Sequence, residues 1–179
     1  MLVIGNNETF VLKALSEHTK GDLSSERFGE NYYIKLQDLL KAGKWKEADR
    51  ETVDRMCEVM DRQEDRWLSR EDIQFFPTRD LNNIDQLWFK YSNGKFGFSV
   101  QKKIYLECGA KPDGKYPGDS IWSKFASQTG WNIGLNKGDY FSTRWAGHLP
   151  TLLFWVDLWR GSWGLDKNLL ILLFSRSDL

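Results

Sequence analysis

The sequence predicts an all-α domain of about seven to eight helices. Apolar residues recur three or four positions apart through most of the chain, which is the spacing of one face of an α-helix. Residues that cap or interrupt helices separate these series at intervals. No two neighbouring segments both show the two-residue alternation of a β-hairpin. With 179 residues, the chain is long enough to form one domain with a substantial core.

We predict an N-terminal extension over residues 1–30, followed by a helical core domain over residues 31–179 that ends in apolar helices. The extension is mixed in character and has neither the basic start nor the long apolar core of a secretory signal. It also carries Glu8 and Glu17, which argue against a transit peptide. The apolar C-terminal stretch is broken by charged residues, which favours buried helices over a membrane span.

Two helices are expected at the start of the core domain. Tyr33, Leu36 and Leu40 fall on one helical face, and Gly43 fits the residue that follows a helix end. The next apolar series, over residues 45–59, runs among alternating acids and bases. This pattern is typical of an amphipathic helix with a solvated charged face, so we expect the charged residues to lie on the surface.

A capping pattern marks the next helix. Ser69 stands three residues before Asp72, which is the spacing of a capping box, and Pro77 would stop the helix. Trp67 and Leu68 therefore precede the cap on a connecting loop.

The Asn93-Gly94 step could belong to a hairpin turn or to the left-handed end of a helix. The residues before it, from a proposed cap at Asp80, keep a helical period, so we predict the helix end. Ser99 is then expected to cap the following helix, and Ser120 to cap the next one after a loop rich in glycine and proline. Residues 131–150 lack periodicity and predict a long loop carrying exposed aromatic side chains.

The sequence contains no motif of a hydrolase, nucleotide-binding enzyme or metalloprotease. Its 25 basic and 25 acidic side chains balance, which disfavours a nucleic-acid partner. Cys57 and Cys108 have no metal-binding spacing. His148 is best explained as a hydrogen-bonded loop anchor. We therefore expect neither enzyme activity, nor a catalytic cofactor, nor a protein metal site.

Aromatic residues are abundant, with nine Trp, eleven Phe and six Tyr. We expect Trp45, Trp88 and Phe89, which lie on predicted helices, to fill the core. For the aromatic residues of the 131–150 loop, core packing and ligand contact remain equally open.

Several segments resemble one known family. The run SNGKFGFSVQ, from Ser92 to Gln101, is the most specific of them. DLNNIDQLW begins at Asp80, and shorter matches include Gly130-Trp131 and the GHLP step at 147–150. These segments resemble the Genomes Uncoupled Four domain family of oxygenic phototrophs, and the resemblance covers roughly residues 32–150.

The resemblance implies a helical domain shaped like a cupped hand, whose concave face between two loops binds protoporphyrin IX and magnesium-protoporphyrin IX. Such proteins are regulators that stimulate magnesium chelatase, through its large porphyrin-binding subunit, in chlorophyll biosynthesis. A monomer is implied, with at most peripheral membrane association, in cyanobacterial cytoplasm or in the chloroplast stroma of a eukaryote. The step just before GHLP departs from the family pattern, so a bilin-binding sensor of linear tetrapyrroles, or a protein-interaction module, is the alternative.

Matching the family segments, together with the need for apolar faces and a cation at the pigment edge, gives the predicted ligand-binding residues. They are Trp67, Leu68, Ser69, Ile73, Phe76, Tyr140, Phe141, Arg144, Trp145 and Arg160.

Overall fold

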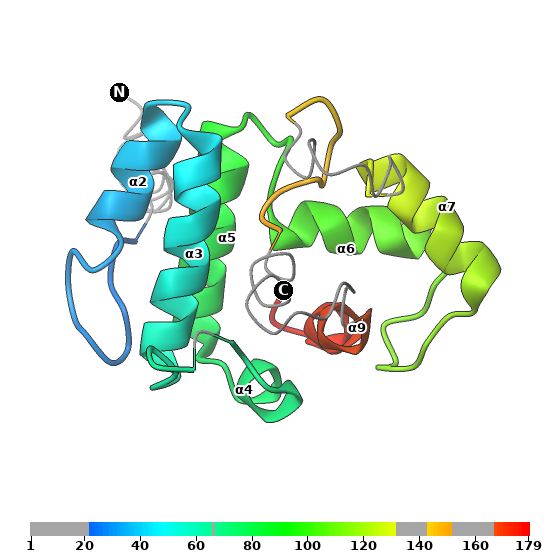
Figure 1. The fold of residues 1–179 in the computed structure, drawn as a ribbon, viewed down its shortest axis with the longest axis horizontal. Coiled ribbons are helices and arrows are strands. Elements are labelled where there is room, and N and C mark those ends of the chain that lie inside the picture. The colour runs from blue at the N-terminus through cyan, green and yellow to red at the C-terminus, as the bar shows by residue number, and fades with distance from the viewer. Residues whose placement is uncertain (1–21, 66, 132–142, 152–166) are drawn as a thin grey trace, which may run out of the picture.

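The computed structural model describes residues 22–65, 67–131, 143–151 and 167–179. Within these ranges it contains helices and no strand, and its one β-bridge is an isolated pairing of Ser25 with Gly29. The predicted all-α class is therefore confirmed. The helices are α2 (Ile34–Lys41), α3 (Trp45–Val59), α4 (Arg70–Gln74), α5 (Thr78–Tyr91), α6 (Phe98–Glu107), α7 (Asp119–Thr129) and α9 (Lys167–Ser175) (Figure 1).

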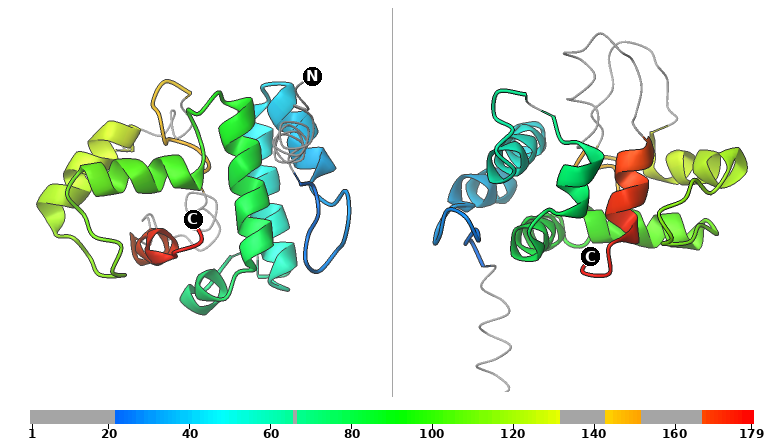
Figure 2. Two further views of the ribbon diagram at one scale, coloured as in Figure 1. Left: turned by 180° about the vertical axis from the view of Figure 1, so that it is seen from behind. Right: turned by 90° about the horizontal axis from the view of Figure 1, so that it is seen from below.

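The helices form two groups joined through the centre of the molecule. In Figure 1, α2, α3 and α5 stand together on one side, and α6 with α7 forms the other. The short helix α4 packs against α9, and the two lie side by side in the views of Figure 2. In the described part of the chain, no helix combines the length and apolarity needed to span a bilayer.

Helix α5 supplies the centre of the core. Its Trp88 is fully buried, and its indole Nε1 donates to the hydroxyl of Thr52 on α3 at 2.9 Å. Trp45 and Phe96 pack around Trp88, with ring centroids 6.2 Å from it in each case. The prediction for Phe89 was wrong, because this side chain is 51% exposed. Adjacent helical residues point about 100° apart, so Phe89 turns outward where Trp88 turns inward.

The predicted helix end at Asn93-Gly94 is confirmed. Both residues have positive φ, at 56° and 77°, and the Gly94 amide donates to the carbonyl of Phe89 at 2.8 Å. The chain thus leaves α5 through a left-handed turn rather than a hairpin.

Three predicted side-chain caps were wrong. Pro77, Gly97 and Gly118 occupy the N-cap positions of α5, α6 and α7 instead of Asp80, Ser99 and Ser120. Each predicted residue lies inside the first turn of its helix.

Asp80 has a long-range role in place of capping. It is fully buried and accepts hydrogen bonds from the Tyr33 hydroxyl at 2.6 Å and from the Glu26 amide at 2.9 Å. It thereby ties the segment before α2 to α5. The predicted extension over residues 1–30 lies mostly outside the described residues, so that domain boundary stays a prediction.

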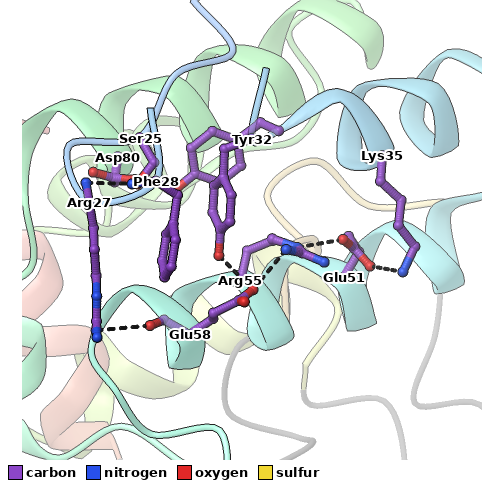
Figure 3. Close-up of polar contacts among 10 residues, drawn as sticks. Ser25, Arg27, Phe28, Tyr32, Lys35, Glu51, Arg55, Glu58 and Asp80 are labelled. Carbon is purple, nitrogen blue, oxygen red and sulfur yellow. Dashed lines mark hydrogen bonds and ion pairs between the residues drawn. The ribbon is translucent and has the colours of Figure 1, made fainter. Parts of the chain in front are cut away.

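The charged face of α3 is not entirely solvated, which corrects the sequence-based expectation. Asp49 and Glu51 are buried, with 0% and 2% exposure. Glu51 accepts from Lys35 at 2.5 Å and from Arg55 at 2.6 Å (Figure 3). Two cations compensate its carboxylate, which explains how it can lie buried.

Gly97 sits where a side chain does not fit. Its φ is 130°, and a Cβ there would lie 2.8 Å from Oδ1 of Asp85. That oxygen accepts the Ser99 amide at 2.9 Å. Burial raises the pKa of Asp85, and the hydrogen bonds to the backbone of Phe98 and Ser99 only partly oppose this effect.

We predict that Gly97→Ala lowers the free energy of unfolding by at least about 2 to 3 kcal/mol, because backbone strain and a clash with Asp85 add together. Gly118→Ala is the matched control, since Gly118 also has positive φ, at 90°, but a Cβ added there would have no other atom within 4 Å. It should cost only about 1 kcal/mol. Urea unfolding measures both, and equal losses would contradict the packing argument.

Candidate functional site

The resemblance places the first of two predicted ligand segments at Trp67 through Phe76, and the second on the aromatic loop before GHLP. The first segment is a capped turn built around Ser69. The Ser69 hydroxyl accepts the Asp72 amide at 3.1 Å, and the Ser69 amide donates to Oδ2 of Asp72 at 2.8 Å. The predicted capping box is therefore confirmed. Arg62 also donates two hydrogen bonds to Asp72, from Nε to Oδ2 at 3.1 Å and from Nη2 to Oδ1 at 3.4 Å. Burial alone would raise the pKa of Asp72, but the hydrogen bonds from Ser69 and Arg62 hold it below its ordinary value.

The register of α4 decides which of its predicted residues can meet a ligand. Leu68, Ile73 and Phe76 face the core, with exposed fractions of 5%, 3% and 2%. Trp67 is half-buried on the loop before the cap. In the described conformation, the three core side chains lie behind the surface that a ligand would touch.

Sequence reasoning missed the accessible phenylalanine of this segment. Phe75 is 67% exposed, whereas its neighbour Phe76 is buried. The capping box could have revealed this, because it fixes where the helical register starts. Ile73 and Phe76 are three residues apart and share a face, so Phe75 must point elsewhere.

The second predicted ligand segment is described over residues 143–151. Its end is fixed to α3 by Thr151, whose amide donates to Oδ1 of buried Asp49 at 2.6 Å and whose hydroxyl contacts the other carboxylate oxygen. The side chain of Gln101 on α6 donates through Nε2 to the carbonyl of Pro150 at 2.8 Å. Asp49 lay on a face that the sequence pattern assigned to solvent, so this contact was missed.

Two backbone hydrogen bonds fix the same segment to the turn before α6. The Gly147 amide donates to the carbonyl of Lys95 at 2.8 Å, and the Gly97 amide donates to the carbonyl of Leu149 at 3.0 Å. The resemblance segments SNGKFGFSVQ and GHLP are thus direct neighbours in space. We call the contacts of residues 147–151 with α3, α6 and residues 95–97 the seam.

His148 is a loop anchor, as the sequence predicts. Its side chain is 2% exposed, and Nδ1 lies 2.9 Å from the carbonyl of Thr129. Because a carbonyl can only accept, Nδ1 carries the proton. The His148 carbonyl accepts the indole Nε1 of Trp131 at 3.1 Å. These bonds join the GHLP step to the end of α7.

Arg144 and Trp145 lie on the same segment as the seam. Arg144 is exposed, and its guanidinium carbon lies 5.5 Å from the centroid of the Trp145 ring. Trp145 is half-buried and packs directly on Gly130, where an added Cβ would lie 2.3 Å from Cδ1 of the indole. Packing and ligand contact are therefore compatible for this tryptophan. Tyr140, Phe141 and Arg160 lie outside the described residues.

The described residues offer no metal centre, since no three His, Cys, Asp or Glu side chains gather among them. The predicted site residues that the structure describes form two groups, one around α4 and one at Arg144 and Trp145. Half-buried indoles and an exposed guanidinium can provide an apolar face and a partner for a carboxylate.

Comparison with known proteins decides the family. The model of the GUN4-like family matches residues 26–169, which include α4 and the whole seam. The chain belongs to the GUN4-like family. The match confirms the resemblance carried by the SNGKFGFSVQ and GHLP segments.

Three GUN4-related proteins illustrate the similarity. The Ycf53-like protein of Synechocystis sp. is 30% identical over 127 residues, covering 67% of this chain and 51% of that protein. The chloroplastic tetrapyrrole-binding protein of Arabidopsis thaliana is 47% identical over 36 residues, covering 20% of this chain and 14% of that protein. The structure of GUN4 from Chlamydomonas reinhardtii aligns with a TM-score of 0.63 at 23% identity, covering 82% of this chain and 88% of that one.

The solved GUN4 structure supports the fold of this chain, and the sequence relatives support the family. The chain spans about half the length of the Ycf53 relatives that it matches.

We predict that Ile73→Asp lowers the free energy of unfolding by about 3 kcal/mol or more, because it buries an unpaired carboxylate in the core. Ile34→Asp is the control, since Ile34 on α2 is 41% exposed, and it should change stability by less than about 1 kcal/mol. Circular dichroism in urea measures both. Equal, small effects would show that Ile73 is accessible and free to contact a ligand.

Proposed function

We propose that this chain binds a tetrapyrrole, namely protoporphyrin IX and magnesium-protoporphyrin IX, and acts as a regulator without catalysing a reaction. The family match over both predicted ligand segments carries this proposal. The Arabidopsis relative is named as a tetrapyrrole-binding protein, which supports it.

The chemistry of the described side chains fits such a ligand. A porphyrin is a large apolar disc with two propionates at one edge, so it needs aromatic or aliphatic faces and a cation or backbone donors. Trp67 would supply part of the face. Arg144, held over the Trp145 ring, would meet a propionate, because a guanidinium can donate two parallel hydrogen bonds to a carboxylate. Tyr140, Phe141 and Arg160 remain proposed members of the same site.

The regulatory part of the proposal is stimulation of magnesium chelatase through its large porphyrin-binding subunit, by a monomer in cyanobacterial cytoplasm or in the stroma. The test adds purified protein to a chelatase assay and follows the formation of magnesium-protoporphyrin. A several-fold faster rate supports the proposal. An unchanged rate, with pigment binding intact, would remove the chelatase from it.

A second candidate is a protein-interaction module, or a sensor of linear tetrapyrroles. Two exposed aromatic side chains favour a protein contact: Phe75 at 67% exposure and Phe89 at 51%. Absorbance spectra after mixing with protoporphyrin or with a bilin separate the candidates. A bilin-specific shift supports the sensor, and the absence of any shift supports the protein-interaction module.

We predict saturable, one-to-one quenching of tryptophan emission by protoporphyrin IX. Trp67→Leu should weaken binding about tenfold, because it removes a ring from the pigment face. Phe89→Leu is the control: it also removes an exposed aromatic ring but lies on α5, and its affinity should stay within about twofold of wild type. Equal weakening by both variants would contradict the proposed position of the pigment.

We predict that metal-free protoporphyrin binds within about tenfold of the magnesium form, because the side chain of His148 is only 2% exposed and is not presented to a pigment at the surface. Arg144→Ala should weaken both pigments alike by removing a propionate partner. Titrations of both pigments against wild type, Arg144→Ala and His148→Ala measure this. Selective loss of the magnesium pigment in His148→Ala would contradict it.

A further inference from the structure

Helix α4 is too short to hold its own position. It contains five residues, Arg70–Gln74. A helix of this length is unstable without tertiary contacts, because the entropy lost in forming the first turn exceeds the stabilisation from its few hydrogen bonds. The position of the first predicted ligand segment therefore depends on what fixes the two ends of α4.

The N-terminal end of α4 is fixed locally. Its partners are Ser69 and Arg62, which bond to Asp72 from three and ten residues away. These contacts explain where α4 begins. The buried side chains of Ile73 and Phe76 pack its other end against the core, but the contacts of Ser69 and Arg62 do not reach its last carbonyls.

The C-terminal end of α4 is fixed by a residue far along the chain. Nη1 of Arg176 donates to the carbonyl of Ile73 at 2.9 Å, across 103 residues. The last carbonyls of a helix have no partner within it, so this part-buried bond satisfies a carbonyl that the helix itself leaves unpaired. It also joins α4 to the segment after α9, in agreement with the packing of α4 on α9 in Figures 1 and 2.

Arg176 is itself held in place. Asp178 accepts its Nε at 2.9 Å and its Nη2 at 2.5 Å, and also accepts the hydroxyl of Thr78 on α5 at 2.6 Å. Hydrogen bonding to the Arg176 guanidinium has the largest effect on the pKa of Asp178. Together with the Thr78 hydroxyl it holds this pKa well below its usual range, although burial acts in the opposite direction. A guanidinium clamped in this way has little rotamer freedom left to lose when it bonds to Ile73.

Lys102 on α6 holds the same C-terminal segment from another side. Its Nζ donates to the carbonyls of Arg176 and Leu179, at 2.6 and 3.0 Å. Lys102 thus bonds to the segment that carries Arg176, whereas Arg176 bonds to α4 directly. The two residues form a matched pair for an experiment.

We propose that Arg176 is a positioning residue for the tetrapyrrole site: by fixing the carbonyl of Ile73, it holds the Trp67–Ile73 segment in the arrangement that binds pigment. The claim that Arg176 affects pigment binding rests on the proposed function. The claim that Arg176 fixes the position of α4 is independent of that function.

The test compares Arg176→Met, Arg176→Lys and Lys102→Met with wild type. Hydrogen exchange of the Ile73 and Phe75 amides, which bond to the carbonyls of Ser69 and Glu71, reports local opening of α4 without ligand. Protoporphyrin IX titration reports affinity, and thermal melting reports global stability.

In Arg176→Met, we expect both amides to exchange about tenfold faster and pigment affinity to fall about tenfold, the effect of losing one hydrogen bond to a charged group. Arg176→Lys should restore part of the exchange protection and part of the affinity. An ammonium can bond to the Ile73 carbonyl or to Asp178, but it cannot form the several parallel hydrogen bonds of a guanidinium. Lys102→Met should lower the melting temperature yet leave α4 exchange and pigment affinity within about twofold of wild type.

Faster α4 exchange in Lys102→Met equal to that in Arg176→Met would overturn the inference, because any loosening of the C-terminal segment would then suffice. Faster exchange in Arg176→Met with unchanged pigment affinity would overturn its functional half. If wild type binds no pigment, the proposed function fails, and the exchange comparison alone decides whether Arg176 fixes α4.

Discussion

The seam between residues 147–151 and the rest of the chain is the interaction on which the structure depends. It joins α3 to the turn before α6 through Asp49 and Thr151, which lie 102 residues apart, and through backbone bonds at Gly97 and Gly147. A buried carboxylate would be costly without hydrogen-bond partners. Because Thr151 contacts both of its oxygens, Asp49 instead sets where this segment must lie.

The two predicted ligand segments are held by different physical means. The segment at the seam is held largely through its own backbone groups, the amides of Gly147 and Thr151 and the carbonyls of Leu149 and Pro150. Arg144 and Trp145 therefore precede an anchored segment that does not depend on their side chains. Helix α4 instead relies on side chains at both of its ends, Asp72 with Arg62 at one and Arg176 at the other. Changes of sequence can therefore alter the first segment by loosening it, and the second by replacing its exposed side chains.

Much of the fold could be predicted because local rules govern it. The left-handed step at Asn93-Gly94 and the capping box at Ser69 depend on nearby residues alone, and the structure confirms both. The caps predicted at Asp80, Ser99 and Ser120 were wrong for one reason. A glycine or proline ahead of each residue already begins the helix, and the Asp80 carboxylate instead accepts a hydrogen bond from a tyrosine 47 residues away.

The site could be predicted only as segments, since the burial of Ile73 and the partners of Asp49 and Arg176 depend on contacts across the whole chain.

The most direct test of this account is a crystal structure of the chain grown with protoporphyrin IX. The account predicts one pigment with Trp67 against its face and Arg144 at a propionate, while α4 and the seam keep the hydrogen bonds described above. Pigment bound elsewhere, for example against the exposed Phe89, or a seam broken to admit it, would contradict the account.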